Sequence, residues 1–218
     1  MIPTSRRATI AGIAMLLTTA GVAGAQAPRR PATTPLSADD KALVDKATAY
    51  LQSLTQIKGR FTQTDARGRV SQGDFYLKRP GKIRFAYDAP TDMLVVSNGA
   101  TVNMFAKRLG TFESYPLGVT PLSLFLAKEI RLDRGVVVSD VKRFSDGFSL
   151  TAKDSKHETD GEIVLVFGSS PMSLREWTVL DSAGQRTRVA LSGLQPAPSL
   201  DPALFILRDP RPGPVGKR

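Results

Sequence analysis

Hydrophobic and polar residues alternate with a period of two along most of the chain after Gly59. Successive side chains of a strand point to opposite faces, so this period is typical of strands with one buried face. Turn-forming pairs such as Asn98-Gly99 and Asp146-Gly147 separate the alternating segments, as in hairpins. We therefore predict an antiparallel meander of eleven strands, over residues 58–65, 69–78, 82–88, 92–97, 100–107, 110–115, 135–143, 147–152, 161–167, 173–181 and 185–194.

Two segments have the apolar spacing of a helix instead. Ser37, with Asp40 three residues later, resembles a capping box, and apolar residues then recur at helical spacing as far as Leu54, which predicts an amphipathic helix. Thr120 at the N-cap and Pro121 at the first helical position predict a second, short helix over residues 120–130. Its apolar residues do not keep to one stripe, so it should be buried on more than one side or face an apolar space.

A sheet of this length must curl, and curling encloses its apolar side. By alternation Phe75 and Leu77 share one face, and Ile83 and Phe85 repeat that pattern in the next strand. The enclosed space is filled by a helix, by side chains or by a ligand. With few helices and one tryptophan, the pattern favours a mainly β chain whose half-open barrel holds something apolar.

Arg79 also falls on the side of Phe75 and Leu77 if the alternation continues. A guanidinium there needs hydrogen-bond partners, because burial of an unpaired charge is expensive. Alternatively, Arg79 lies past the regular part of the strand, next to Pro80, and turns to solvent. The pattern alone leaves both positions open.

The ends of the chain differ from this alternating part. Arg6 and Arg7 precede an apolar run of about 15 residues, short of the roughly 20 that span a bilayer, and small residues follow up to Ala25. We predict a signal peptide over residues 1–25, cut after Ala25, and an exported protein. Residues 26–36 are expected to be a flexible leader, 37–207 one folded domain, and 208–218 a flexible, basic, proline-rich tail.

Composition excludes several kinds of site. The chain has no cysteine and one histidine, His157, so disulfides, thiol nucleophiles and multi-histidine metal sites are impossible. His157 lies in a polar stretch that we expect to be an exposed loop. No catalytic constellation emerges, so we predict neither an enzyme nor a bound cofactor. The net charge of +10 comes from dispersed basic residues. This dispersal argues against nucleic acid as a binding partner and favours anionic lipid head groups as the polyanion that the basic surface meets.

Several short motifs occur in order between residues 37 and 207. They are Gly59-Arg60-Phe61-Thr62-Gln63, Gly73-Asp74-Phe75-Tyr76-Leu77-Lys78-Arg79-Pro80, Asp88-Ala89-Pro90, Val96-Ser97-Asn98-Gly99, Thr120-Pro121-Leu122 and the segment 181–186. Together they resemble the LolA family of periplasmic carriers for outer-membrane lipoproteins.

The resemblance implies a fold, a site and a latch. The fold would be an unclosed antiparallel β-barrel of about eleven strands with an α-helical lid over an apolar cavity, the lid comprising the helices from Ser37 and from Pro121. The family's Lys-Arg-Pro arginine, which latches the lid, corresponds to Arg79. Acyl chains would occupy a cavity lined by Phe75, Leu77, Ile83, Phe85, Val102, Met104 and Trp177 from the sheet and by Leu122, Phe125 and Leu126 from the lid. A dry packed core would give the same pattern.

The resemblance also implies a place and partners. The protein would be a periplasmic monomer that takes acylated lipoproteins from an inner-membrane lipoprotein-releasing ABC transporter and passes them to an outer-membrane acceptor, with transient proximity to both membranes. An alternative is a periplasmic lipid-binding or lipoprotein-sensing domain of the same fold with a different apolar cargo. A hydrolase on this scaffold is disfavoured, because it would need a nucleophile and base that the sequence does not offer.

Overall fold

The computed structural model describes residues 35–120, 122–132, 136–154, 161–180 and 184–211. The expected signal peptide, nearly all of the leader, Pro121, His157 and most of the expected tail lie outside the described residues.

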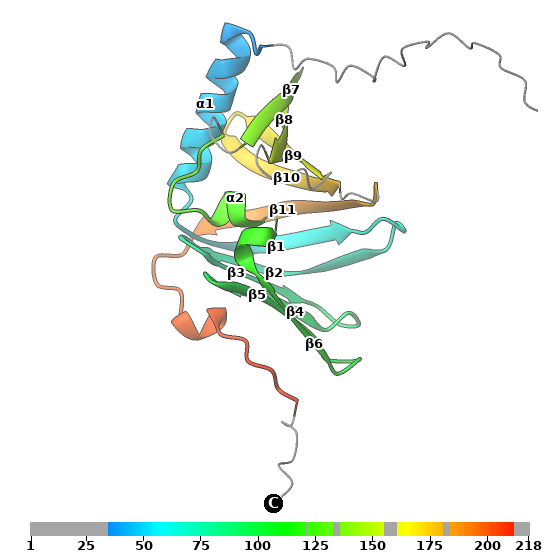
Figure 1. Cartoon of the computed structure of the whole chain (residues 1–218). Coiled ribbons are helices and arrows are strands. Elements are labelled where there is room, and N and C mark those ends of the chain that lie inside the picture. Colours follow the sequence, from blue (N-terminus) through cyan, green and yellow to red (C-terminus); the bar gives the residue numbers. More distant parts are fainter. Residues whose placement is uncertain (1–34, 121, 133–135, 155–160, 181–183, 212–218) are drawn as a thin grey trace, which may run out of the picture. The chain divides into compact units, whose positions relative to one another are not determined.

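Eleven antiparallel strands form one sheet, in the order β6-β5-β4-β3-β2-β1-β11-β10-β9-β8-β7 (Figure 1). β6 and β7 are therefore the two edges, and the sheet is not closed. This confirms the predicted fold class and the number of strands. The strands are β1 Gln56–Thr64, β2 Val70–Lys78, β3 Lys82–Tyr87, β4 Met93–Asn98, β5 Thr101–Ala106, β6 Thr111–Pro116, β7 Val136–Phe144, β8 Gly147–Asp154, β9 Glu162–Ser169, β10 Met172–Leu180 and β11 Arg186–Pro196.

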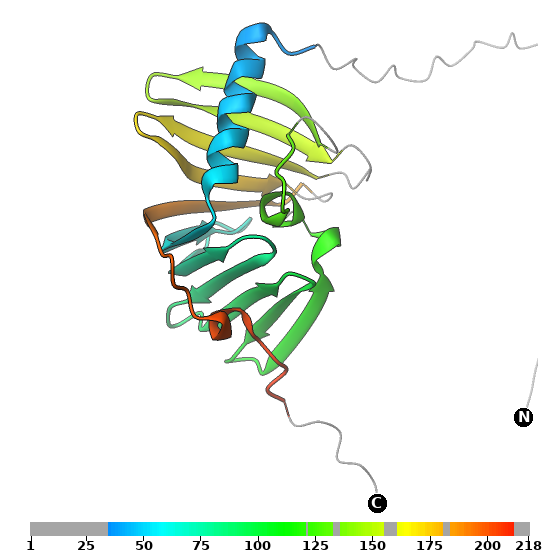
Figure 2. The same cartoon turned by 90° about the vertical axis from the view of Figure 1, so that its left-hand side faces the viewer.

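Helix α1 (Ala38–Ser53) crosses the inner face of β7 to β10 (Figure 2). Half of the expected capping box is present: the Ser37 hydroxyl accepts a hydrogen bond from the Asp40 amide at 3.1 Å, and the Asp40 carboxylate accepts one from that same hydroxyl at 2.6 Å. Leu51 is buried, and the ring of Tyr50 meets that of Phe167 edge-on at 6.3 Å. The interior beneath α1 is thus filled by side chains.

The second helix is shorter than the predicted 120–130. A 3₁₀ turn, η1 (Leu117–Val119), precedes α2, which covers only Leu122–Leu126. At the end of α2 the backbone carbonyls bond to the β2–β3 turn instead of continuing the helix: Leu126 accepts from the Gly81 amide at 2.8 Å, and Ala127 accepts from the Arg79 guanidinium at 2.6 Å.

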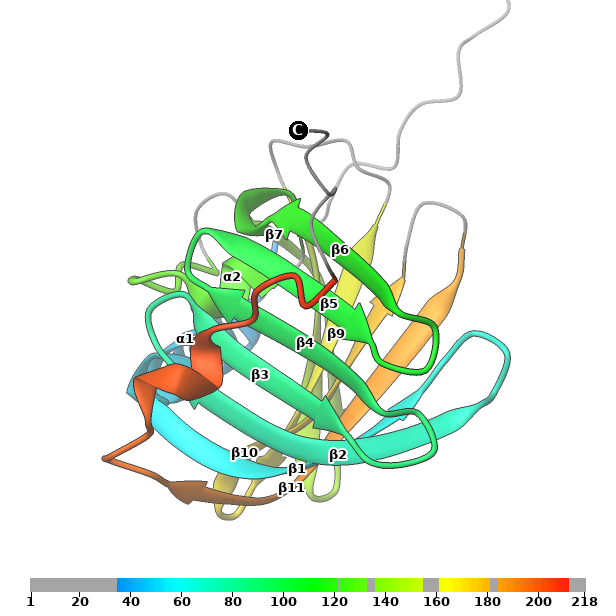
Figure 3. The same ribbon diagram turned by 90° about the horizontal axis from the view of Figure 1, so that it is seen from below.

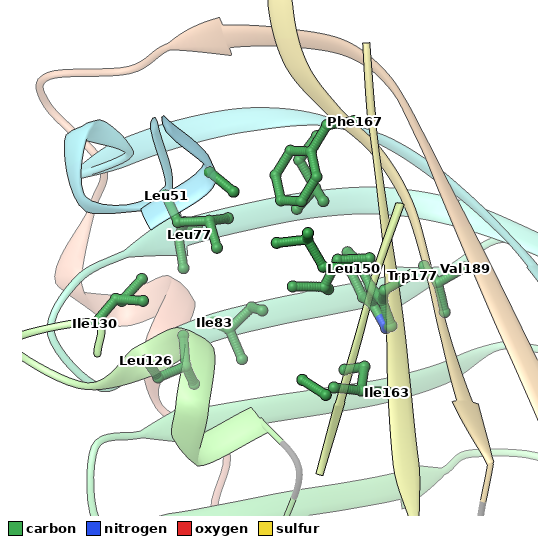
Figure 4. Close-up of a cluster of buried hydrophobic side chains, with 14 of the residues drawn as sticks. Leu51, Leu77, Ile83, Leu126, Ile130, Leu150, Ile163, Phe167, Trp177 and Val189 are labelled. Carbon is green, nitrogen blue, oxygen red and sulfur yellow. The ribbon is translucent and has the colours of Figure 1, made fainter. Parts of the chain in front are cut away.

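Most of the core lies on the inner face of the sheet, as the period-two pattern predicts. Register places Phe75 opposite Phe85 and Leu77 opposite Ile83. Figure 4 shows Leu77 and Ile83 beside the lid residues Leu126 and Ile130, within one cluster of buried side chains. The inner face and the lid therefore share a continuous apolar interior.

The outer face carries a second apolar cluster that the sequence did not lead us to expect. Residues 197–207, here called the C-terminal strap, include the 3₁₀ helix η2 (Pro202–Phe205) and run outside β3 to β5 (Figure 3). Phe205 and Val96 bury their side chains together. The side chains of Arg84 and Asn103 donate to strap carbonyls, each at 3.0 Å. The strap thus belongs to the folded domain.

Candidate functional site

A pocket lies between the inner face of the sheet, the last turn of α1 and the helix α2. Its free volume is about 30 Å³, room for about one water molecule. All of its lining residues are apolar except one arginine. They are Leu51, Leu54, Ile57, Phe75, Leu77, Arg79, Ile83, Leu122, Phe125, Ile130, Leu174, Trp177 and Leu191.

Trp177 joins the sheet to α2 inside this pocket. Its ring lies 6.4 Å from Phe75 on β2 and 5.9 Å from Phe125 on α2, between centroids. Phe85 packs behind them, 5.3 Å from Phe75 and 6.1 Å from Trp177. Tilted and edge-on arrangements of this kind are the favoured ones for aromatic pairs. The aromatic side chains of the site therefore form one connected group.

The structure places the predicted cavity residues in three positions. Six line the pocket: Phe75, Leu77, Ile83, Trp177, Leu122 and Phe125. Phe85, Val102 and Leu126 are buried in the same apolar cluster but do not reach the pocket wall. Met104, paired with Val95 on the inner face, is only partly buried nearer the β6 edge and does not line the pocket. Contact between any of these residues and an acyl chain stays a prediction.

Sequence reasoning missed six lining residues: Leu51, Leu54, Ile57, Ile130, Leu174 and Leu191. Some were recognisable from register. Ile57 lies opposite Leu77, and Leu191 lies opposite Phe61, so both follow from the alternation once the strand pairs are known. Ile130 depends on how the chain leaves α2, for which the sequence contains no comparable signal.

Arg79 follows the last residue of β2, and its backbone amide donates to the Thr55 carbonyl at 2.8 Å. Of the two positions that the sequence left open, the structure has the partnered one. Nη1 donates to the Leu51 carbonyl at 2.8 Å, and Nη2 donates to the Ala127 carbonyl at 2.6 Å. Longer contacts reach the Gln52 and Lys128 carbonyls, both at 3.4 Å. One guanidinium thus bridges the end of α1 and the chain after α2.

Partial burial lowers the pKa of the Arg79 guanidinium, because desolvation disfavours the charged form. An arginine nevertheless stays protonated in proteins, and its partners are backbone carbonyls, whose dipoles stabilise the cation. The site therefore keeps one fixed positive charge at its rim.

The turn that carries Arg79 is tight. Gly81 has a φ of +80°, and a Cβ at this position would lie 2.6 Å from the Cα of Gly99. Only glycine meets both conditions without strain. Its amide donates to the Leu126 carbonyl at 2.8 Å, and its carbonyl accepts from the Ser97 hydroxyl at 2.7 Å. The β2–β3 turn is therefore held against the end of α2 by backbone as well as by Arg79.

The lining suits the binding of apolar molecules, because Arg79 is its single charged side chain. Across the described part of the chain, no group of three His, Asp or Glu side chains is arranged to hold a metal ion. In the same part of the chain, no helix is both long enough and apolar enough to cross a membrane.

The family model described as "Outer membrane lipoprotein carrier protein LolA" matches residues 52–208. The outer-membrane lipoprotein carrier protein of Methylococcus capsulatus is 31% identical over 175 residues, which cover 74% of this chain and 81% of that protein. That of Azotobacter vinelandii is 28% identical over 196 residues, covering 82% and 89%. A solved LolA superfamily structure from Nitrosomonas europaea aligns with a TM-score of 0.46 at 8% identity, covering 77% of this chain and 97% of that one. The chain belongs to the LolA family of outer membrane lipoprotein carrier proteins.

Proposed function

We propose that the protein carries lipoproteins by holding their acyl chains in the apolar pocket between the sheet and the lid, and that it moves them from the inner to the outer membrane. The observation that carries the proposal is an apolar pocket closed by two helical segments in a chain of this family. No covalent step is required, because the cargo only changes its apolar surroundings.

The closed pocket must enlarge to take cargo. A free volume of about 30 Å³ is far smaller than an acyl chain, so lid side chains have to move away from the sheet. Burial of each methylene contributes about 0.8 kcal/mol, so a chain of about twelve methylenes gains roughly 10 kcal/mol. Hydrogen bonds to a charged group contribute about 1.5–3 kcal/mol each. Acyl burial is therefore large enough to offset the loss of several lid contacts.

Arg79 is proposed to latch the closed state. The planar guanidinium directs separate N–H groups at carbonyls of two different segments, Leu51 and Ala127. A lysine ammonium in its place would be a compact point charge without this fork. The latch stabilises the empty, closed protein and so favours handing the cargo on once an acceptor is available.

Residues 1–25 are proposed to direct export, so that the mature carrier works in the periplasm between an inner-membrane lipoprotein-releasing ABC transporter and an outer-membrane acceptor. Support comes from the relatives in Methylococcus capsulatus and Azotobacter vinelandii, which are outer-membrane lipoprotein carrier proteins. A carrier that holds its cargo in a pocket of a single domain needs no second subunit, so we propose a monomer.

The test is competition for the pocket. Protein purified without detergent is loaded with an apolar fluorescent probe, and a triacylated lipopeptide or the same peptide without acyl chains is added. We expect displacement by the lipopeptide alone, and transfer of loaded lipoprotein to outer-membrane vesicles. Equal displacement by both peptides would contradict an acyl site. Displacement by phospholipid but not by lipopeptide would favour a different apolar cargo.

A further inference from the structure

Gln52, in the last turn of α1, contacts the chain just after α2. Its side-chain amide nitrogen Nε2 donates to the Lys128 carbonyl at 3.1 Å, and its oxygen Oε1 accepts from the Ile130 amide at 2.9 Å. A strand residue in a parallel ladder likewise donates to one residue of its neighbour and accepts from the residue two positions further on. The carboxamide of Gln52 therefore takes the place of a strand backbone beside residues 128–130.

This carboxamide also belongs to the Arg79 network. Gln52 Oε1 accepts from Arg79 Nη2 at 3.3 Å, and the same Nη2 donates to the Ala127 carbonyl at 2.6 Å. Both lone-pair sites of the amide oxygen are thus used, one by a backbone N–H and one by a cation. Residues 122–130, here called the gate segment, are held by Gln52 and Arg79 together.

The two sides of this network are anchored differently. At its other end α1 is tied to the edge strand β7 by an ion pair between Asp40 and Arg143, at 2.8 Å, and Ala47 is fully buried. The gate segment is a single short helix followed by irregular chain. Its backbone is joined to the β2–β3 turn by a hydrogen bond from the Gly81 amide to the Leu126 carbonyl, at 2.8 Å. α1 is therefore a long helix held along its length, by the ion pair at one end and buried side chains beyond it, whereas the gate segment is a single turn of helix whose end is held by Gln52, Arg79 and Gly81.

We infer that Gln52 is a positioning residue that fastens the gate segment to α1, so that the pocket opens when the gate segment leaves Gln52 and Arg79 while α1 stays on β7 to β10. The inference rests on the proposed function, because it specifies how the proposed acyl pocket opens. A side chain outside the Lys-Arg-Pro motif, Gln52, therefore helps to hold the gate segment in its closed position. Removing the carboxamide leaves the partly buried Ile130 amide without its partner, which favours the open gate.

Hydrogen exchange on the cargo-free, full-length mature protein tests this inference. In Gln52→Ala we expect the Ile130 amide to exchange about tenfold faster, as loss of a pair of hydrogen bonds predicts, and apolar probe uptake to rise. Gln52→Glu keeps the acceptor for Ile130 and pairs a carboxylate with Arg79, but it loses the donor to Lys128, so its exchange should lie nearer to wild type than to Gln52→Ala. Gln72→Ala, at an exposed glutamine on β2, is the matched control and should match wild type.

Each outcome separates the inference from the proposed function. Unchanged Ile130 exchange and probe uptake in Gln52→Ala would overturn the inference, even if the wild type binds lipopeptide. Faster exchange throughout α1 in that variant would overturn it too, because α1 would then move with the gate. If Ile130 exchange rises in Gln52→Ala but the wild type takes up no lipopeptide, the fastening by Gln52 stands and the proposed cargo is wrong.

Discussion

Trp177 on β10 and Phe125 on α2 face each other across the pocket, with ring centroids 5.9 Å apart and planes inclined by 37°. One ring belongs to the sheet and the other to the gate segment. Trp177 is also the only tryptophan of the chain. Its fluorescence therefore reports on the pocket and on the position of the gate.

We expect a triacylated lipopeptide to change the Trp177 emission, because acyl chains that enter the pocket separate Trp177 from Phe125. The unacylated peptide should leave the spectrum unchanged. Titration followed by intrinsic fluorescence measures the effect, and Trp177→Phe is the control, since it should bind lipopeptide by mass spectrometry without the optical signal. Identical spectra with and without bound lipopeptide would place the acyl chains elsewhere.

Arg79→Leu should loosen the closed gate, because it removes the donors to the Leu51 and Ala127 carbonyls. Two such bonds are worth roughly tenfold or more in the equilibrium between closed and open states. The closed–open equilibrium of Arg79→Lys should lie between those of Arg79→Leu and wild type, since lysine keeps the charge but lacks the planar fork. We expect lipoprotein to load normally and to be transferred to acceptor membranes slowly.

Lys82→Leu, on the neighbouring strand β3, is the control for this loss of charge. Loading and transfer are measured separately with the same lipoprotein. If Arg79→Leu and Lys82→Leu both deliver cargo like wild type, Arg79 is a structural contact and not a latch.

The strands were predictable because alternation and turn residues are local signals. The inner positions of Phe75, Leu77 and Ile83 follow directly from them. Alternation places Arg79 on the side of Phe75 and Leu77, where it lines the pocket, but its partners are the carbonyls of Leu51 and Ala127, far away in sequence. No local pattern encodes those partners.

The parts that sequence reasoning missed depend on tertiary contacts. The second helix ends early because the carbonyls of Leu126 and Ala127 bond to the β2–β3 turn. The C-terminal strap has no regular period, and its burial of Phe205 depends on an apolar patch around Val96 on the outer face. Met104 lies on the predicted face but outside the pocket, because the lid covers only part of that face.

Phe205→Ala should destabilise the protein by about 3 kcal/mol, because it removes a ring that is 1% exposed and leaves a gap between the strap and the sheet. The neighbouring Ile206 is 56% exposed, so Ile206→Ala should change stability by less than about 0.5 kcal/mol. Urea unfolding of both variants measures the difference. Equal effects of the two substitutions would show that the strap is not packed on the outer face.

Gly73→Ala should also be destabilising, by about 2 kcal/mol. Gly73 lies in register between Phe61 and Tyr87, whose rings approach to 4.8 Å, and a Cβ there would lie 2.0 Å from the Ala86 carbonyl oxygen. At Gly118 a Cβ would meet nothing within 4 Å, so Gly118→Ala should be neutral within about 0.5 kcal/mol. Thermal unfolding compares the two, and a neutral Gly73→Ala would contradict this packing.

The ion pair that anchors α1 should make stability depend on acid. The Ser37 hydroxyl and the Arg143 guanidinium hold the pKa of Asp40 below its ordinary value of 3.8. The folded state therefore gains stability that is fully present above pH 3.8 and is lost as the pH falls through the lower pKa of the folded protein. Asp40→Asn should be less stable than wild type at pH 7, and the gap should narrow below pH 3.8. The midpoints of urea unfolding of both proteins, measured across this pH range, test the prediction. A difference in stability that does not change with pH would show that protonation of Asp40 is not coupled to folding.

The two unpaired edges of the sheet make it compliant. Within the described residues no ladder joins β6 to β7, whereas the circumference of a closed barrel is fixed by its strand number and stagger. This sheet is free to change its curvature while all its interstrand pairs stay intact. Enlarging the interior then requires side chains to separate but no backbone hydrogen bond to break. We expect the same carrier to admit acyl chains of different lengths, with the curvature of the sheet adjusting to each load.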